Sequence, residues 1–278
     1  AMQGKKIAAF SAMLACVILL MSGCTSEEAA VRSDENVKPV IIVGSDNYPP
    51  YNYEDANGQP MGIDVDLAAE AFDRMGYRAV FSVIDWEAKK ELVESGEIDC
   101  IWGSFSINGR EEQYRWSAPY MLSRQVVAVR RDSDIYTLSD LAGKRVAVQS
   151  TTKPEELFVS HTDPRIPELR EIFSLQNREL IYPFLSKGYV DAIAAHETAI
   201  LQCMSDYGLD YRILEEPLLT VGLGVAFAKG DTRGLERQLS EVFEDMRADG
   251  TMEQIIGKYL EEPQKYMEVE TDEGGTEK

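Results

Sequence analysis

Two hydrophobic periodicities alternate along the chain between about residues 38 and 260. Short continuous apolar runs are typical of buried strands, and apolar residues recurring every three or four positions are typical of amphipathic helices. The predicted strands cover residues 40–44, 77–83, 98–102, 145–149, 170–174 and 189–194. Strands alternating with helices predict an α/β fold of mainly parallel sheets with helices on both faces.

The helix ends carry local sequence signals. Asp64 is predicted to cap a helix that Gly76 ends, and Asp85 opens a helix that stops near Gly96. Further helices are predicted at residues 153–159, up to residue 187, and at 235–248 and 252–260. Two β-rich runs, residues 124–130 and 221–228, bracket the second block and are predicted as paired crossings between two lobes. Two lobes built from such sheets would face each other across a cleft at the carboxyl ends of their strands.

The first residues have the character of an export signal. Two lysines precede an uncharged apolar run over residues 7–21, which ends at Ser22-Gly23-Cys24. The segment resembles a bacterial lipoprotein signal, although Met21 stands where leucine is usual. A buried apolar helix with an incidental cysteine is the alternative. We expect residues 1–23 to be removed and Cys24 to be lipidated, anchoring the protein to the outer face of the cytoplasmic membrane.

Composition limits what the rest of the chain can do. Residues 24–37 and 261–278 are acidic and poor in large apolar residues, so they are predicted to be a disordered tether and a disordered tail. The formal net charge of −20 argues against binding to nucleic acid. Cys100 and Cys203 lie in apolar patterns, which favour buried free thiols over a disulfide. No spacing of cysteine and histidine is typical of a metal site, so no metal or other cofactor is predicted.

A set of motifs in a fixed order supports a more specific interpretation. They are Ser45-Asp46-Asn47-Tyr48-Pro49-Pro50-Tyr51, Gly62-Ile63-Asp64-Val65-Asp66-Leu67, Ile98-Asp99-Cys100-Ile101, Ser104-Phe105-Ser106…Arg110, Trp116-Ser117…Pro119-Tyr120, Gly143-Lys144-Arg145-Val146-Ala147-Val148 and Met246-Arg247-Ala248-Asp249-Gly250-Thr251-Met252. Together they resemble the family 3 extracellular solute-binding proteins, the polar amino-acid receptors of ABC importers.

The resemblance implies a periplasmic-binding-protein-like clamshell with two hinge strands. Residues 38–124 with 225–260 would form the first lobe, and residues 125–224 the second. It further implies a monomer that binds an amino acid or related small carboxylate and delivers it to a membrane permease with its ATPase.

The resemblance also implies how the carboxylate of the ligand is held. Arg110 follows Ser104 and Ser106 at the position of the arginine that binds this group, and a guanidinium fork suits it. The loop between Ser106 and Arg110 is one residue shorter than is common in the family. Thr151 and Thr152 precede a helix, whose N-terminal N–H groups favour an anion; simple capping would use the same residues.

The remaining candidate site residues differ in how the family uses them. Asp46, Tyr48, Tyr51 and Trp86 match positions near the ligand side chain, where aromatic faces sandwich a ligand. His196 stands where the family usually has an aspartate that pairs with the ligand ammonium. A neutral imidazole supplies no full negative charge, and protonation near pH 6 would then weaken binding. Alternatively, His196 caps the helix that begins there.

Two other functions use the same fold. A free-standing extracellular sensor would share every motif above. An enzyme similar to a cyclohexadienyl dehydratase is the second alternative, with His196 or Glu197 as acid or base. No pairing of a nucleophile with a base supports catalysis, so we predict a binding protein and not an enzyme.

Overall fold

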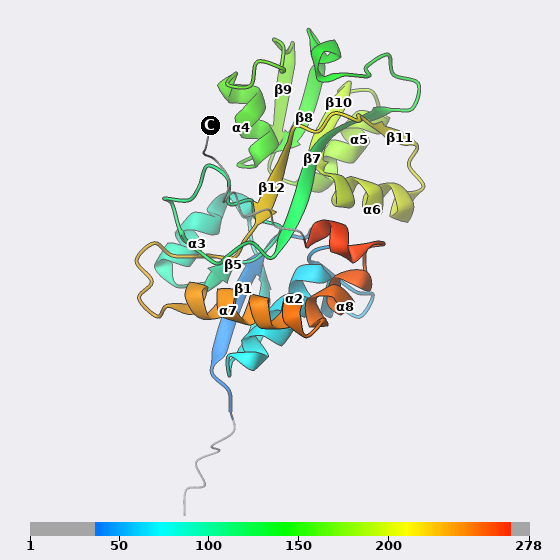
Figure 1. Cartoon of the computed structure of the whole chain (residues 1–278). Coiled ribbons are helices and arrows are strands. Elements are labelled where there is room, and N and C mark those ends of the chain that lie inside the picture. The colour runs from blue at the N-terminus through cyan, green and yellow to red at the C-terminus, as the bar shows by residue number, and fades with distance from the viewer. Residues whose placement is uncertain (1–36, 268–278) are drawn as a thin grey trace, which may run out of the picture. The chain divides into compact units, whose positions relative to one another are not determined.

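A computed structural model describes residues 37–267, and its compact unit begins at Lys38 (Figure 1). The predicted signal peptide, Cys24 and nearly all of the predicted tether lie outside these residues. Among residues 37–267, no helix has the length and apolar character needed to cross a bilayer, and no group of histidine, cysteine or acidic side chains could hold a metal ion. Cys100 and Cys203 are buried free thiols.

The first lobe contains a five-stranded sheet in the order β4-β1-β5-β13-β6. Its strands are β1 (Val40–Ser45), β4 (Arg78–Val83), β5 (Cys100–Ile101), β6 (Arg115–Trp116) and β13 (Ala226–Phe227). β1 pairs in parallel with β4 and β5, whereas β13 pairs antiparallel with β5 and β6. Beside the sheet lie the helices α2 (Ile63–Arg74), α3 (Lys89–Ser95), α7 (Leu235–Ala248) and α8 (Thr251–Gly257), together with a two-stranded sheet of β2 (Tyr53–Glu54) and β3 (Pro60–Met61).

The second lobe contains a six-stranded sheet in the order β11-β7-β10-β8-β9, with β12 also paired to β7. Its strands are β7 (Met121–Arg130), β8 (Arg145–Gln149), β9 (Glu171–Leu175), β10 (Ala192–His196), β11 (Tyr211–Ile213) and β12 (Leu219–Leu223). Its helices are α4 (Lys153–Ser160), α5 (Ile181–Ser186) and α6 (Glu197–Tyr207). Separate apolar clusters include alternate residues of β7, as expected for a sheet covered on both faces.

β7 and β12 run side by side, antiparallel, between the two lobes (Figure 1). They correspond to the two crossings predicted from the β-rich runs. The second run is interrupted at Gly224, where Ile107 and Trp116 approach within 3.2 Å of the position that a Cβ would occupy. Because the chain returns through these strands, both sheets are mixed rather than mainly parallel as predicted.

Two local predictions need correction. The helix α2 begins at Ile63 after Gly62, so Asp64 does not cap it. Instead the Asp64 carboxylate is buried, and it accepts hydrogen bonds from the Ser104 N–H and the Tyr120 hydroxyl at 2.7 Å each. The predicted disordered tail includes a short 3-10 helix, η4 (Pro263–Tyr266). Tyr266 packs against the apolar core of the first lobe, because the tail carries more large apolar surface than its charge suggests.

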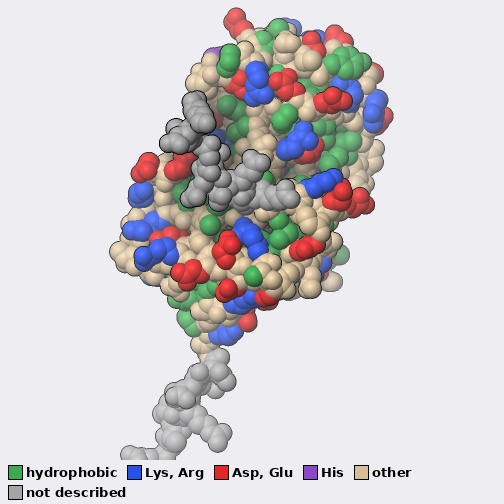
Figure 2. All heavy atoms as spheres, in the orientation of Figure 1, with side chains coloured by type: hydrophobic (Ala, Val, Ile, Leu, Met, Phe, Trp, Pro, Cys, Tyr) green, Lys and Arg blue, Asp and Glu red, His purple; other side chains and the backbone are tan. Residues whose placement is uncertain are grey.

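Ionised side chains of both signs are interspersed on the face shown in Figure 2. No block of one sign dominates that face, despite the net charge of −20. The exterior drawn there therefore offers no single-sign patch that would steer a charged partner.

Candidate functional site

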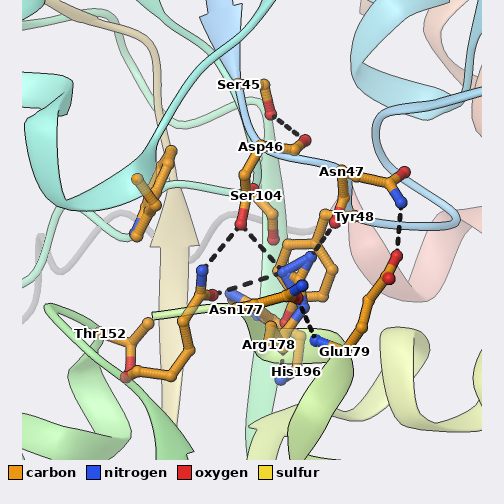
Figure 3. Close-up of polar contacts among 12 residues, drawn as sticks. Ser45, Asp46, Asn47, Tyr48, Ser104, Thr152, Asn177, Arg178, Glu179 and His196 are labelled. Carbon is orange, nitrogen blue, oxygen red and sulfur yellow. Dashed lines mark hydrogen bonds and ion pairs between the residues drawn. The ribbon is translucent and has the colours of Figure 1, made fainter. Parts of the chain in front are cut away.

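A cavity lies between the two lobes, at the ends of β1, β8 and β10 (Figure 3). Its free volume is about 30 Å³, enough for one or two water molecules. Entry of a larger ligand therefore requires the lobes to separate or the side chains in the cleft to move. Nine predicted site residues line it: Asp46, Tyr48, Trp86, Ser104, Ser106, Arg110, Thr151, Thr152 and His196.

Tyr51 was predicted to lie near the ligand side chain, but it does not line this cavity. Its side chain is fully buried, and its hydroxyl hydrogen-bonds to Thr198 at 2.5 Å, which joins the first lobe to α6 of the second. Burial raises the pKa of Tyr51 to about 12, so this hydroxyl stays protonated. Tyr51 therefore belongs to the packing behind the site.

Arg110 reaches the cavity despite the shortened loop that precedes it. The side chain is buried, and its guanidinium donates to the Ser106 carbonyl at 3.1 Å and to the Thr151 carbonyl at 3.3 Å. It also lies against the Phe105 ring. Burial lowers the pKa of Arg110, but a guanidinium remains charged at any physiological pH. Both acceptors are neutral carbonyls, so its charge is not balanced by a carboxylate contact.

The N-terminus of α4 faces Arg110 across the cleft. Thr152 precedes the helix, but its hydroxyl donates to the Gln149 carbonyl at 2.6 Å and makes no capping hydrogen bond. The capping alternative for this hydroxyl is therefore wrong. Thr151 has a positive φ of 59°, and its carbonyl accepts from Arg110. The first N–H groups of a helix have no intrahelical acceptor and leave a partial positive charge, which Glu155 and Glu156 in the first turn partly offset.

Trp86 and Tyr48 form aromatic walls of the cavity. Both are buried, and Trp86 packs edge-on against Phe105. Behind Trp86 lies the ammonium of Lys89, 4.7 Å from the ring centroid, which donates to the Thr151 hydroxyl at 2.8 Å. Burial and the nearby charge of Arg110 lower the pKa of Lys89 to about 8. At pH 7 this lysine is still mostly protonated.

Arg178, a residue that sequence analysis missed, occupies the opposite end of the cavity. It comes from the short 3-10 helix η3 (Arg178–Leu180), and its side chain is only 5% exposed. Its guanidinium stacks on the Tyr48 ring and pairs with the Asp46 carboxylate at 3.1 Å (Figure 3). Asp46 also accepts from the Gln149 amide at 2.9 Å. The carboxylate expected near a ligand side chain is thus paired within the protein.

His196 ends β10 and is buried beside Tyr48. Its Nδ1 hydrogen-bonds with the Ser123 hydroxyl at 2.7 Å, and its Nε2 lies 3.1 Å from the Gln125 amide nitrogen. Burial, and next the charge of Arg178, lower the pKa of His196 to about 3. His196 occupies the N-cap position of α6, but its ring makes no capping hydrogen bond. Both ring nitrogens have protein partners, and the ring stays neutral above about pH 4.

Two further polar atoms face the cavity without a protein partner among the described residues. They are the Ser104 hydroxyl and the Gln125 side-chain oxygen. Ser104 has a positive φ of 50°, held by the bond from its N–H to Asp64. Gln125 was not predicted, because a polar residue inside the apolar run of β7 gives no sign of the face to which it points.

Comparison with known proteins agrees with this architecture. Residues 40–262 match the model of the bacterial extracellular solute-binding proteins, family 3. The chain is 30% identical over 255 residues to the histidine-binding periplasmic protein of Salmonella typhimurium, covering 88% of this chain and 94% of that protein. It is 29% identical over 224 residues to the glutamate-binding protein GluB of Corynebacterium glutamicum, covering 76% and 74%.

Solved structures give the same picture. An ABC uptake transporter substrate-binding protein from Streptococcus pneumoniae with bound histidine superposes with a TM-score of 0.74 at 25% identity, covering 80% of this chain and 92% of that one. An ancestral amino-acid-binding protein described as a precursor of cyclohexadienyl dehydratase has a TM-score of 0.71 at 24% identity, covering 80% and 96%. The second likeness concerns the fold alone.

Proposed function

The chain belongs to the bacterial extracellular solute-binding proteins of family 3, and from this premise we propose that it is the substrate-binding lipoprotein of an ABC importer. Its ligand is an amino acid or a related small carboxylate, held in the cavity between the lobes. The protein acts as a monomer and hands this ligand to a membrane permease with its ATPase.

Arg110 carries this proposal. It is a buried cation that lines the cavity, and among residues 37–267 its hydrogen bonds go only to neutral carbonyls, so a ligand carboxylate would supply a charge partner. A carboxylate between Arg110 and the N-terminus of α4 would touch both lobes. Because such a ligand binds the closed form better than the open form, it shifts the population towards closure. Ser104 and Ser106 would complete the carboxylate end.

The anchor is the second part of the proposal. Cys24 would carry the lipid and hold the protein at the outer face of the cytoplasmic membrane. Labelling cells with a radioactive fatty acid tests this: the wild-type chain should incorporate label and remain with membranes. A Cys24→Ala chain should do neither. Labelling that persists in Cys24→Ala would refute the lipidation site.

Ligand binding is tested directly with residues 38–267. We would screen amino acids, their derivatives and small carboxylates by thermal shift and measure the hits by isothermal titration calorimetry. A ligand at a hundred times its Kd should stabilise the protein by about 2.7 kcal/mol, a rise of a few degrees in Tm. A folded protein with no response to any carboxylate would overturn the proposal.

Two alternatives share this fold. A free-standing sensor would bind the same ligand but would not support uptake, so deletion of the gene should leave import of the labelled ligand unchanged. A dehydratase would turn over its substrate instead of only binding it. Conversion of a cyclohexadienyl substrate by the purified protein would favour that alternative.

A further inference from the structure

The basic side chains around the cavity fall into two classes. Arg178 pairs with Asp46 at 3.1 Å, and Lys153 pairs with Glu156 at 2.7 Å. By contrast, Arg110 and Lys89 donate hydrogen bonds only to carbonyl and hydroxyl oxygens among residues 37–267. All four side chains are at least nine-tenths buried. The cavity wall therefore holds one cation without a carboxylate contact, Arg110, and Lys89 lies behind the wall on Trp86 and Thr151.

The acidic groups near the cavity do not offset this excess. Asp46 is the one acidic residue that lines the cavity in the described part of the chain, and Arg178 already balances it. Glu87 and Glu155 act on the charge of Lys89, and Glu156 and Glu111 act on that of Arg110. All four lie outside the cavity and are exposed or partly exposed, so screening by water weakens their effect there.

No group at the far end is suited to a ligand ammonium. The nitrogens of His196 are engaged with Ser123 and Gln125. The Gln125 oxygen is unpartnered, but it is neutral. An ammonium buried there would lie near the positive charge of Arg178. It would lose its hydrating water and gain only one neutral acceptor, the Gln125 oxygen. Burying a cation without a charge partner is costly.

We infer that the natural ligand is a small carboxylate without an α-ammonium group, such as a 2-oxo acid or an unsubstituted diacid. This inference rests on the proposed function and names its ligand class. One carboxylate binds at Arg110 and the N-terminus of α4. The ligand 2-oxygen or chain meets the Ser104 hydroxyl.

The test compares ligands that differ only in the ammonium. Calorimetry would measure 2-oxoglutarate and glutarate against L-glutamate, and oxaloacetate and succinate against L-aspartate. We expect the diacid or 2-oxo diacid of each set to bind at least tenfold more tightly than the amino acid. Equal or tighter binding of the amino acids would overturn the inference and leave the proposed function standing. Absence of binding by every compound, together with a blank amino-acid screen, would overturn both.

A charge substitution in the cavity provides a second readout. Gln125→Glu keeps the shape of the side chain and adds one negative charge beside the far end of the ligand. The Gln125→Glu variant should bind the diacid at least tenfold more weakly. The difference in affinity between the diacid and the matched amino acid should become smaller. Gln238→Glu adds the same charge on the exposed face of α7. It should change neither the affinity for the diacid nor its ratio to the affinity for the amino acid. If both variants shift binding alike, or Gln125→Glu leaves the diacid preference unchanged, the inference is wrong.

Discussion

Arg110 and Arg178 are two buried arginines at opposite ends of one cavity, and they differ in what balances their charge. Arg178 has a carboxylate, Asp46, and an aromatic face, Tyr48. Arg110 donates to two backbone carbonyls, and one of them, that of Thr151, lies just before α4. A guanidinium with its own carboxylate contributes to the contact between the lobes, whereas one with only neutral acceptors retains charge for a ligand. Under the proposed function, the same residue type stabilises the contact between the lobes at Arg178 and binds the ligand at Arg110.

The largest expected effect comes from removing the guanidinium that has no carboxylate. Arg110→Ala should weaken binding of every carboxylate about 100-fold or more, because two charge-assisted hydrogen bonds are lost. Calorimetry measures the loss, and circular dichroism verifies that the variant is folded. The control is Arg131→Ala, which removes an exposed arginine from the surface of the second lobe. Binding within threefold of wild type in Arg110→Ala would contradict the contrast between the two arginines.

Removing the paired guanidinium should change selectivity rather than abolish binding. In Arg178→Met, Asp46 loses its charge partner and can accept a ligand ammonium. We expect the affinity ratio of L-glutamate to 2-oxoglutarate to rise about tenfold in titrations of the two compounds. The variant should also be less stable, since a largely buried carboxylate is left unpaired. An unchanged ratio would indicate that Asp46 is inaccessible from the cavity.

The pH dependence of binding should come from Lys89 and not from His196. Because the pKa of Lys89 is lowered to about 8, raising the pH from 7 to 9 removes its proton and should weaken diacid binding several-fold. Since the pKa of His196 is about 3, the affinity should stay flat from pH 5 to 7, unlike the weakening near pH 6 predicted from the sequence. Lys89→Met should remove the decline above pH 7. A decline that persists in Lys89→Met would assign it to another group.

The smallest effect on binding is expected from Asp64, which supports the Ser104 end from behind. Burial raises its pKa from 3.8 to about 7, so between these values the folded state holds more protons than the unfolded state. The free energy of unfolding should therefore fall as the pH rises from about 4 to 7. Asp64→Asn should remove this contribution, giving a flatter profile in urea titrations at pH 5 and 8. A slope equal to that of the wild type would show that Asp64 is ionised throughout.

Much of the fold could be predicted from local patterns. The strand at residues 145–149 and the helix at residues 235–248 have the bounds that their periodicity predicted. Boundaries shifted where a tertiary contact overrode a local signal. Asp64 has the features of a helix cap, yet Ser104 and Tyr120 recruit its carboxylate from distant parts of the chain.

The sequence by itself determined which residues could form the carboxylate end, because Ser104, Ser106 and Arg110 lie within one short motif whose spacing is local. The other end was decided only by the tertiary structure. Arg178 is 132 positions from Asp46, and nothing in either neighbourhood indicates that they pair. The net charge of −20 likewise gives no sign that basic residues outnumber acidic residues around the cavity. Charge balance at a buried site depends on which groups meet through space, and only the packing of the two lobes decides that.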